Sequence, residues 1–157
     1  MYMNELKIFP YKSKYHTDFV NISLEWLKKH DLYEDSDKPI LENPKAIIIK
    51  NGGHILLAEY RNKIVGTVTL KKINEFTFEL LKLGVIDAYQ GIGIGTELML
   101  YCIQLSKNIG AKKIILETNS KLESAVALYK KFNFKEIPIS DMTYDMADFK
   151  MELSLNK

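Results

Sequence analysis

The chain has 157 residues, the size of one globular domain, and 46% of them are hydrophobic. It carries 22 lysines and arginines against 20 aspartates and glutamates, so its formal net charge is only +2. This balance argues against nucleic acid as a partner, since nucleic-acid binding needs a concentrated basic face. We also expect no membrane association, because no hydrophobic run reaches the ~18 residues of a membrane span.

Cysteine and histidine usage points to a reducing compartment and to no metal site. Cys102 is the single cysteine, so no internal disulfide bond can form, and a cytoplasmic location is expected. The N-terminus also lacks the basic start and apolar core of a signal peptide. His16, His30 and His54 lie far apart, with no second ligand at metal-binding spacing.

The first third of the chain predicts one strand and a helical layer. Leu6–Phe9 is an apolar run that stops at Pro10, as a short strand would. Apolar residues then recur at helical spacing and predict an amphipathic helix over Lys14–Lys29. An acidic loop follows over Asp31–Asp37, and a second short helix is expected near Asp37–Glu42.

The next segment has two interpretations. Asn43 and Pro44 have the form of a helix N-cap followed by proline at the first helical position, and Asn51-Gly52-Gly53 supplies a stop. The run Ala46–Ile49 between them would also suit a strand. We favour a short helix.

Three strands are expected after His54. Residues 55–60, 63–73 and 76–86 are rich in β-branched and other apolar side chains. Arg61-Asn62 and Asn74-Glu75 separate them at tight-turn length. The three segments therefore predict an antiparallel meander.

Three alternating glycines follow the third of these strands. Gly91, Gly93 and Gly95 come after a four-residue connection, and a helical pattern runs from Ile94 until Gly110 ends it. A strand, a glycine turn and a helix N-terminus in this order form an anion site, because unpaired N–H groups converge at the positive end of the helix dipole. The glycines permit positive φ and close approach of a ligand. We expect a phosphate-bearing ligand here.

The rest of the chain predicts a strand, a helix and two last strands. Lys113–Thr118 reads as a strand parallel to the one before the glycines, because a helix connects them. Ser120-Lys121-Leu122-Glu123 has the form of a capping box that opens another helix. Lys135–Ile139 and the alternating run Phe149–Leu155 are the last strands, with a polar loop over Ser140–Asp148. The whole predicts a single α/β domain over residues 1–157, with a mixed, mostly antiparallel sheet.

Two classes of ligand compete for the glycine loop. A dinucleotide-binding G-x-G-x-x-G motif would need a third glycine at Thr96, and hairpins rather than a βαβ unit precede the loop. Glu117, at the end of the next strand, does imitate the acidic residue of that motif. A Walker loop is absent from the sequence, which contains no Gly-Lys-Ser/Thr. The dinucleotide interpretation is therefore disfavoured.

Three segments carry a resemblance to the GNAT family of N-acetyltransferases. Gln90–Gly95 matches its Q/R-x-x-G-x-G/A signature, Glu79–Val85 looks like its fourth strand, and Ser124–Phe134 is similar to its S-A-x-x-L-Y-x-K-x-G-F segment. The resemblance covers about Leu6–Leu155. It implies the GNAT fold, with about seven strands and four helices. It also implies acetyl-CoA as co-substrate, a small-molecule or peptide amine as acceptor, and a possible homodimer.

The resemblance also implies where coenzyme A lies. Backbone N–H groups from Gln90 to Thr96 would bind the pyrophosphate, and one backbone N–H at Val85 or Ile86 would polarise the acetyl carbonyl. Leu122 stands where many members have an asparagine that reaches the pantetheine, and Asn119 is the candidate replacement. The coenzyme A residues so implied are Val85, Ile86, Gln90, Gly91, Ile92, Gly93, Ile94, Gly95, Thr96 and Asn119.

Acyl transfer to an amine needs a base for the ammonium and an acid for the departing thiolate. Tyr129 matches the family's general-acid tyrosine, although its helical spacing would also suit a core residue. Glu79 and Glu117 both correspond to acidic positions that family members use as base, and Glu79 is favoured. Asn133 replaces the usual glycine before the final phenylalanine, which asparagine permits because it tolerates the left-handed conformation.

The resemblance implies that the acceptor lies between the first two helices and the loop that joins the last two strands. Acidic residues in both places would attract a cationic amine, unless they are merely solvated. Trp26, Tyr33, Glu34 and Tyr144 are the candidate acceptor contacts. A non-catalytic acyl-CoA-binding module is the alternative function. The acidic residues are Asp31, Glu34, Asp35, Asp37, Asp141, Asp145 and Asp148.

Overall fold

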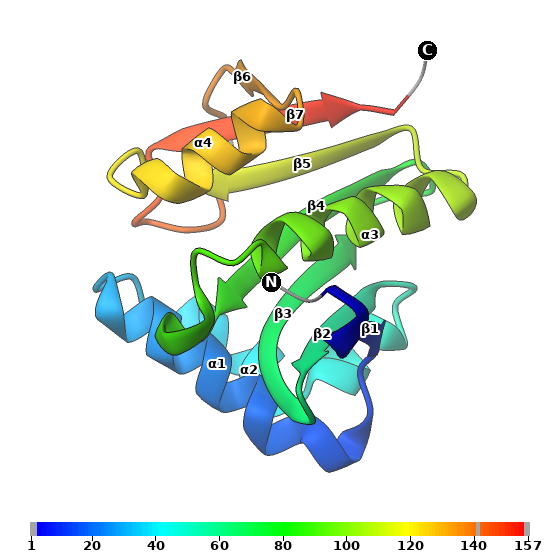
Figure 1. Cartoon of the computed structure of the whole chain (residues 1–157). Helices are drawn as coiled ribbons and strands as arrows, with labels where there is room; N and C mark the ends of the chain where they lie inside the picture. Colours follow the sequence, from blue (N-terminus) through cyan, green and yellow to red (C-terminus); the bar gives the residue numbers. More distant parts are fainter. Residues whose placement is uncertain (1–2, 141, 156–157) are drawn as a thin grey trace.

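One seven-stranded sheet, in the order β1-β2-β3-β4-β5-β7-β6, forms the centre of the computed structural model, which describes residues 3–140 and 142–155 (Figure 1). All neighbours are antiparallel except β4 and β5, which are parallel as predicted. The strands are β1 Leu6–Pro10, β2 His54–Tyr60, β3 Lys63–Lys72, β4 Thr77–Val85, β5 Lys113–Thr118, β6 Lys135–Ile137 and β7 Phe149–Ser154.

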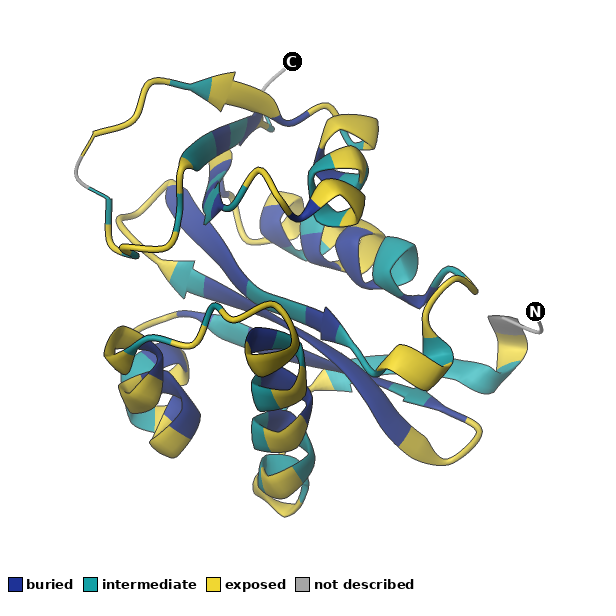
Figure 2. Ribbon diagram, turned by 90° about the vertical axis from the view of Figure 1, so that its left-hand side faces the viewer, coloured by how far each residue is buried: buried dark blue, intermediate teal, exposed yellow. Residues whose placement is uncertain are grey.

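Helices cover both faces of the sheet. Figure 2 shows α3 and α4 on one side of the buried strands and α1 and α2 on the other. The Ala46–Ile49 run is helical rather than a strand, as favoured, and forms a π-helical turn. None of the described helices has the length and hydrophobicity to span a membrane. The helices are α1 His16–Lys29, α2 Lys38–Glu42, η4 Lys45–Ile49, α3 Ile94–Asn108 and α4 Glu123–Lys131, with 3-10 turns at Met3–Glu5 (η1), Ser13–Tyr15 (η2), Asp35–Asp37 (η3) and Asp87–Tyr89 (η5).

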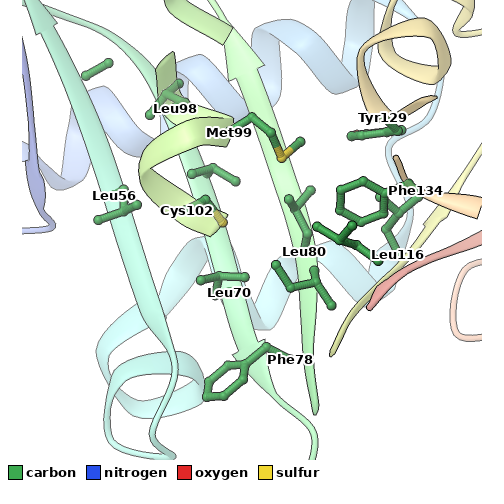
Figure 3. Close-up of a cluster of buried hydrophobic side chains, with 14 of the residues drawn as sticks. Leu56, Leu70, Phe78, Leu80, Leu98, Met99, Cys102, Leu116, Tyr129 and Phe134 are labelled. Carbon is green, nitrogen blue, oxygen red and sulfur yellow. The ribbon is translucent and has the colours of Figure 1, made fainter. Parts of the chain in front are cut away.

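The larger core lies between α3, α4 and the sheet. Alternate residues of β4, Phe78 and Leu80, point into it and belong to the same cluster of buried side chains as Leu98 and Met99 of α3 (Figure 3). Burial of each such side chain contributes roughly 1.5–3 kcal/mol to folding. Cys102 lies in this core, where burial raises the pKa of its thiol to about 12 and leaves it unreactive.

The sheet opens between β4 and β5. Their ladder joins Thr77–Glu79 to Lys113–Ile115, and beyond it the two strands part (Figure 1). The backbone edge of β4 that follows Glu79 therefore faces an opening rather than a neighbouring strand. A β-bulge adds to this geometry, because Lys82 has a φ of +56° and the register against β3 shifts there.

One predicted helix cap is wrong. Helix α4 begins at Glu123 after Leu122, and the Ser120 hydroxyl donates to Asp148 Oδ2 at 2.8 Å instead of capping the helix. A hydrogen bond to an ionised carboxylate is stronger than the neutral bond that a serine cap makes with a backbone N–H. Here the carboxylate comes from the distant β6–β7 connection. Asn43 ends α2 and also precedes the next helical turn as predicted, because Pro44 opens that turn and the Asn43 carbonyl accepts from the Ile47 N–H at 3.0 Å, although no side-chain bond caps it. The predicted left-handed conformation of Asn133 is confirmed by a φ of +71°.

Candidate functional site

The glycine loop joins the end of β4 to the start of α3. Gly91 and Gly93 have φ values of +79° and +95°, and Gly93 is the N-cap of α3. A side chain in this conformation costs roughly 1–2 kcal/mol, which explains glycine at both positions. The first helical bond runs from Glu97 N–H to the Gly93 carbonyl. The N–H groups of residues 94–96 therefore precede the helical ladder and lie at the positive end of α3.

A cavity of about 560 Å³ opens beside this loop, and we call it the loop cavity. The end of β4, the end of α1 and the start of α4 form its other walls. Among the described residues, three of the predicted contacts, Ile86, Ile92 and Asn119, do not line it. The predicted residues that do are Val85, Gln90, Gly91, Gly93, Ile94, Gly95 and Thr96.

Strand pairing separates Val85 from Ile86. The Ile86 N–H donates to the Val65 carbonyl of β3 at 2.8 Å, so it is already engaged. Because donors alternate along a strand, the Val85 N–H faces the opposite edge, where the sheet is open. The Val85 carbonyl accepts from Gln90 Nε2 at 2.9 Å, which fastens the glycine loop to the end of β4. Of the two residues, Val85 alone has a backbone donor directed at the opening.

Positive charge in the loop cavity comes from residues that the sequence analysis did not single out. Lys29 and His30 at the end of α1 and Lys121 before α4 line it. Lys29 Nζ lies 2.8 Å from Asp87 Oδ1. Partial burial, with the nearby Lys29 charge, lowers the pKa of His30. The basic residues at the end of the first predicted helix were the feature of the sequence that could have indicated this wall of the loop cavity.

A second, smaller cavity of about 100 Å³ adjoins the loop cavity, and we call it the inner cavity. Both cavities are lined by Trp26, Leu83 and Leu122, so these side chains mark their junction. Tyr129 of α4 lines the inner cavity and packs on Phe134 with ring centroids 5.8 Å apart (Figure 3). It is thus both a core residue and a cavity residue. Burial raises the pKa of its phenol, which stays protonated and able to donate at neutral pH.

The two candidate bases differ in their surroundings. Glu79 is buried in β4 between Lys71 of β3 and Ile115 of β5, and it lines neither cavity. Burial and the nearby Glu117 carboxylate raise the pKa of Glu79. Glu117 does line the inner cavity, but its Oε1 accepts from the N–H groups of Thr143 and Tyr144 at 2.9 and 3.0 Å.

A buried ion pair lies in the wall of the inner cavity. Lys82 Nζ donates to Asp37 Oδ1, and Lys82 Nζ also lies 5.1 Å from the centre of the Tyr144 ring. Burial lowers the pKa of Lys82, while its bond to Asp37 acts in the opposite direction. Burial, followed by the charge of Glu79, raises the pKa of Tyr144. Sequence reasoning missed Lys82, since a lysine inside an apolar strand reads as an exposed residue.

The predicted acceptor contacts are only partly brought together. Trp26, Glu34 and Tyr144 line the inner cavity, whereas Tyr33 is 41% exposed and lines neither cavity. Asn119 lines the inner cavity, where its amide donates to the Met146 carbonyl at 2.8 Å.

The acidic residues around the acceptor site are not all free. Asp37 is paired with Lys82, Glu34 accepts backbone N–H groups, and Asp148 accepts from Ser120. Asp141 lies outside the described residues. Within residues 3–140 and 142–155, no three histidine, cysteine or acidic side chains are grouped as metal ligands would be.

Comparison with known proteins identifies the family to which this geometry belongs. The model of the acetyltransferase (GNAT) family matches residues 17–134. A GNAT-family acetyltransferase from Staphylococcus aureus Mu50 superposes with a TM-score of 0.85 at 26% identity, covering 96% of this chain and 99% of that one. The PaiA N-acetyltransferase of Thermoplasma acidophilum, solved in complex with coenzyme A, has a TM-score of 0.78 at 19% identity, with coverages of 95% and 98%.

A curated relative matches over a shorter stretch. Human N-acetyltransferase 8B is 28% identical over 97 residues, which are 59% of this chain and 43% of the human protein. The chain therefore spans less than half the length of that relative.

Proposed function

Because the chain belongs to the acetyltransferase (GNAT) family, we propose that it is an N-acetyltransferase that moves the acetyl group of acetyl-CoA to a primary amine. One observation carries the proposal: a cavity at the glycine loop and the N-terminus of α3 adjoins a second cavity that is lined by a buried tyrosine and a carboxylate. The acceptor is a small-molecule or peptide amine, and the lone buried cysteine supports a cytoplasmic location.

The loop cavity fits the charged half of coenzyme A. The N–H groups that begin α3 suit a pyrophosphate, and Gly91 and Gly93 let it approach the backbone closely. Two lysines lie on the facing wall, Lys121 and Lys29, of which Lys29 is also paired with Asp87. These lysines supply positive charge that Gln90 does not, because Gln90 is neutral and its amide donates to the Val85 carbonyl and to Asp87 Oδ1.

The opening beside β4 fits the acetyl end. The Val85 N–H, directed at this edge, would donate to the acetyl carbonyl oxygen. This bond strengthens as the carbonyl becomes an oxyanion under attack, which stabilises the transition state. Because Trp26, Leu83 and Leu122 line both cavities, an amine in the inner cavity would lie next to the acetyl carbonyl, which supports direct attack in a ternary complex.

Proton movements then assign the remaining residues. The amine nitrogen forms a bond to the carbonyl carbon, and the carbon–sulfur bond breaks. In becoming an amide the ammonium nitrogen loses two protons: a carboxylate accepts one and releases it to solvent, and the other replaces the proton that Tyr129 donates to the departing sulfur. Glu79 and Glu117 are the candidate bases, with Glu79 acting through water since it lines neither cavity. The raised pKa of Glu79 moves it closer to neutrality, where a base is most effective.

Release of free thiol tests the proposal. With acetyl-CoA and a panel of primary amines, we expect thiol release that depends on both enzyme and amine. Trp26 is the only tryptophan of the chain and lines both cavities, so quenching of its fluorescence by coenzyme A gives the affinity, with NADH as the control ligand. Quenching without turnover of any amine would support the alternative, a non-catalytic acyl-CoA-binding module. Quenching by NADH alone would support a dinucleotide-binding protein and end the proposal.

A further inference from the structure

We propose that Glu117 and Glu34 are positioning residues that hold segment 142–148 of the β6–β7 connection beside the inner cavity. We call this segment the acceptor segment. The proposal rests on the proposed function, because the acceptor is the amine of that reaction. It deepens that function by removing Glu117 from the choice of base and leaving Glu79.

Glu117 of β5 provides the first attachment. Its Oε1 accepts from Thr143 N–H at 2.9 Å and from Tyr144 N–H at 3.0 Å, and its Oε2 lies 3.1 Å from the same Thr143 nitrogen. Hydrogen bonds to an ionised acceptor are roughly twice as strong as neutral ones. The bonds fix the backbone on either side of the Thr143–Tyr144 peptide, and so they fix the position of the Tyr144 ring.

Glu34, in the connection after α1, provides the second attachment. Its Oε1 accepts from Asp145 N–H and its Oε2 from Met146 N–H, both at 2.9 Å. Four consecutive N–H groups of the acceptor segment thus end on two carboxylates from other parts of the fold. The segment belongs to no helix or strand, so these carboxylates supply the partners that a ladder would otherwise give.

Glu34 is itself connected to strand β4. Its backbone N–H donates to Asp37 Oδ2 at 2.9 Å, and Asp37 Oδ1 accepts from Lys82 at the β4 bulge. The Lys82 ammonium also faces the Tyr144 ring of the acceptor segment. A closed series of contacts therefore runs from β4 through Asp37 and Glu34 to the acceptor segment and back to β4. These contacts therefore attach the acceptor segment to β4, the strand that presents Val85.

The same contacts make Glu117 a poor base. A base needs a lone pair aimed at the proton that it takes. Both Glu117 oxygens face backbone N–H groups, whereas Glu79 makes no hydrogen bond through its carboxylate in the described part of the chain. Glu79 is therefore the carboxylate that is free to accept a proton.

Glutamine and alanine variants separate the two roles of Glu117. In Glu117→Gln the amide oxygen can still accept the N–H groups, so we expect kcat and KM within about threefold of the wild type. Glu117→Ala and Glu34→Ala should raise KM for the amine about tenfold or more, with a smaller change in kcat and unchanged coenzyme A affinity. Glu136→Ala, at an exposed carboxylate on β6, is the control and should change neither.

Two kinetic outcomes would overturn the proposal. A loss of kcat of about a hundredfold in Glu117→Gln would make Glu117 the base. An unchanged KM for the amine in both alanine variants would mean that the two carboxylates do not position the acceptor segment.

Amide hydrogen exchange tests the attachment without any turnover. In the free protein, Glu117→Ala should speed exchange at residues 143 and 144, and Glu34→Ala at residues 145 and 146, by about tenfold. Glu136→Ala should leave all four rates unchanged. Equal rates in all proteins would refute the attachment. Since no substrate is present, failure of the proposed function would leave this result intact, and the two failures are distinguishable.

Discussion

Lys82 and Asp37 form an ion pair whose side chains are 4% and 1% exposed. Two ions buried this deeply lose most of their hydration, and their attraction offsets this loss only when further hydrogen bonds complete the site. Asp37 has such a bond from the Glu34 N–H, and Lys82 has the face of the Tyr144 ring. The pair joins β4 to the connection after α1, and it sits in the wall of the inner cavity. We infer that it maintains the shape of the acceptor site.

Removing one member of this pair should destabilise the fold strongly. Lys82→Met leaves Asp37 as an uncompensated buried charge, which costs roughly 3–5 kcal/mol of unfolding free energy. Chemical denaturation measures the change. Lys113→Met breaks the exposed pair with Glu152 and should cost less than about 1 kcal/mol. Adding Asp37→Asn to Lys82→Met should recover part of the loss. No recovery in the double variant would contradict an electrostatic origin.

Alanine variants at two glycines with the same backbone conformation distinguish an effect on coenzyme A binding from an effect on folding. Gly91 has a φ of +79° and Gly110 a φ of +85°, and a Cβ at either would meet no atom of the described residues within 4 Å. Alanine at each should therefore cost a similar ~1–2 kcal/mol. Of the two positions only Gly91 lines the loop cavity, so only Gly91→Ala should weaken coenzyme A binding. Trp26 fluorescence measures the affinity. Equal affinities in the two variants would show that the glycine loop does not hold coenzyme A.

Local patterns in the sequence predicted most of the fold. The alternation in β7 and the helical stripe of α1 each depend on neighbours within a few residues, and both elements formed. The glycine loop was predictable for the same reason, because Gly91, Gly93 and the following helix are adjacent in the chain. Gly93 indeed became the N-cap of α3.

The contacts of the inner cavity could not be read from the sequence in this way. Lys82 and Asp37 are 45 positions apart, and Glu34 meets Asp145 across 111 positions. Such contacts depend on how β4, α1 and the β6–β7 connection come together. The same cause explains the wrong cap at Ser120, since its partner Asp148 arrives from 28 residues away. Three acidic residues of the predicted cationic-substrate site, Glu34, Asp37 and Asp148, instead accept hydrogen bonds from backbone N–H groups of other segments or of their own.

The pH dependence of activity should follow the protonation of the Glu79 carboxyl group. Burial raises its pKa, so kcat/KM should rise with pH and bend above the ordinary range of a glutamate. Glu79→Gln cannot accept the proton and should lower kcat by at least a hundredfold while removing this bend. The pH profile of the control variant Glu136→Gln should match the wild type. Retention of the bend in Glu79→Gln would assign it to another group.

Stability should depend on the same group, with a defined sign. Because the pKa of Glu79 is raised in the folded state, the folded protein holds this proton more tightly than the unfolded chain does. Its stability contribution is complete below the ordinary glutamate pKa and is lost as the pH rises through the raised pKa. The Tm of Glu79→Gln relative to the wild type should therefore increase with pH across this range. Parallel Tm curves would mean that the Glu79 pKa is not raised.

Tyr129 should matter for turnover and not for binding. Tyr129→Phe keeps the ring that packs on Phe134 but removes the hydroxyl proposed to protonate the sulfur. We expect kcat to fall about a hundredfold, with the coenzyme A affinity unchanged within about twofold. Tyr101→Phe is the matched control, since Tyr101 is exposed on α3 and should keep full activity. The fall should be smaller for an acyl donor whose leaving thiol has a low pKa, because such a thiolate departs without a proton. An unchanged kcat in Tyr129→Phe would leave the tyrosine as a core residue alone.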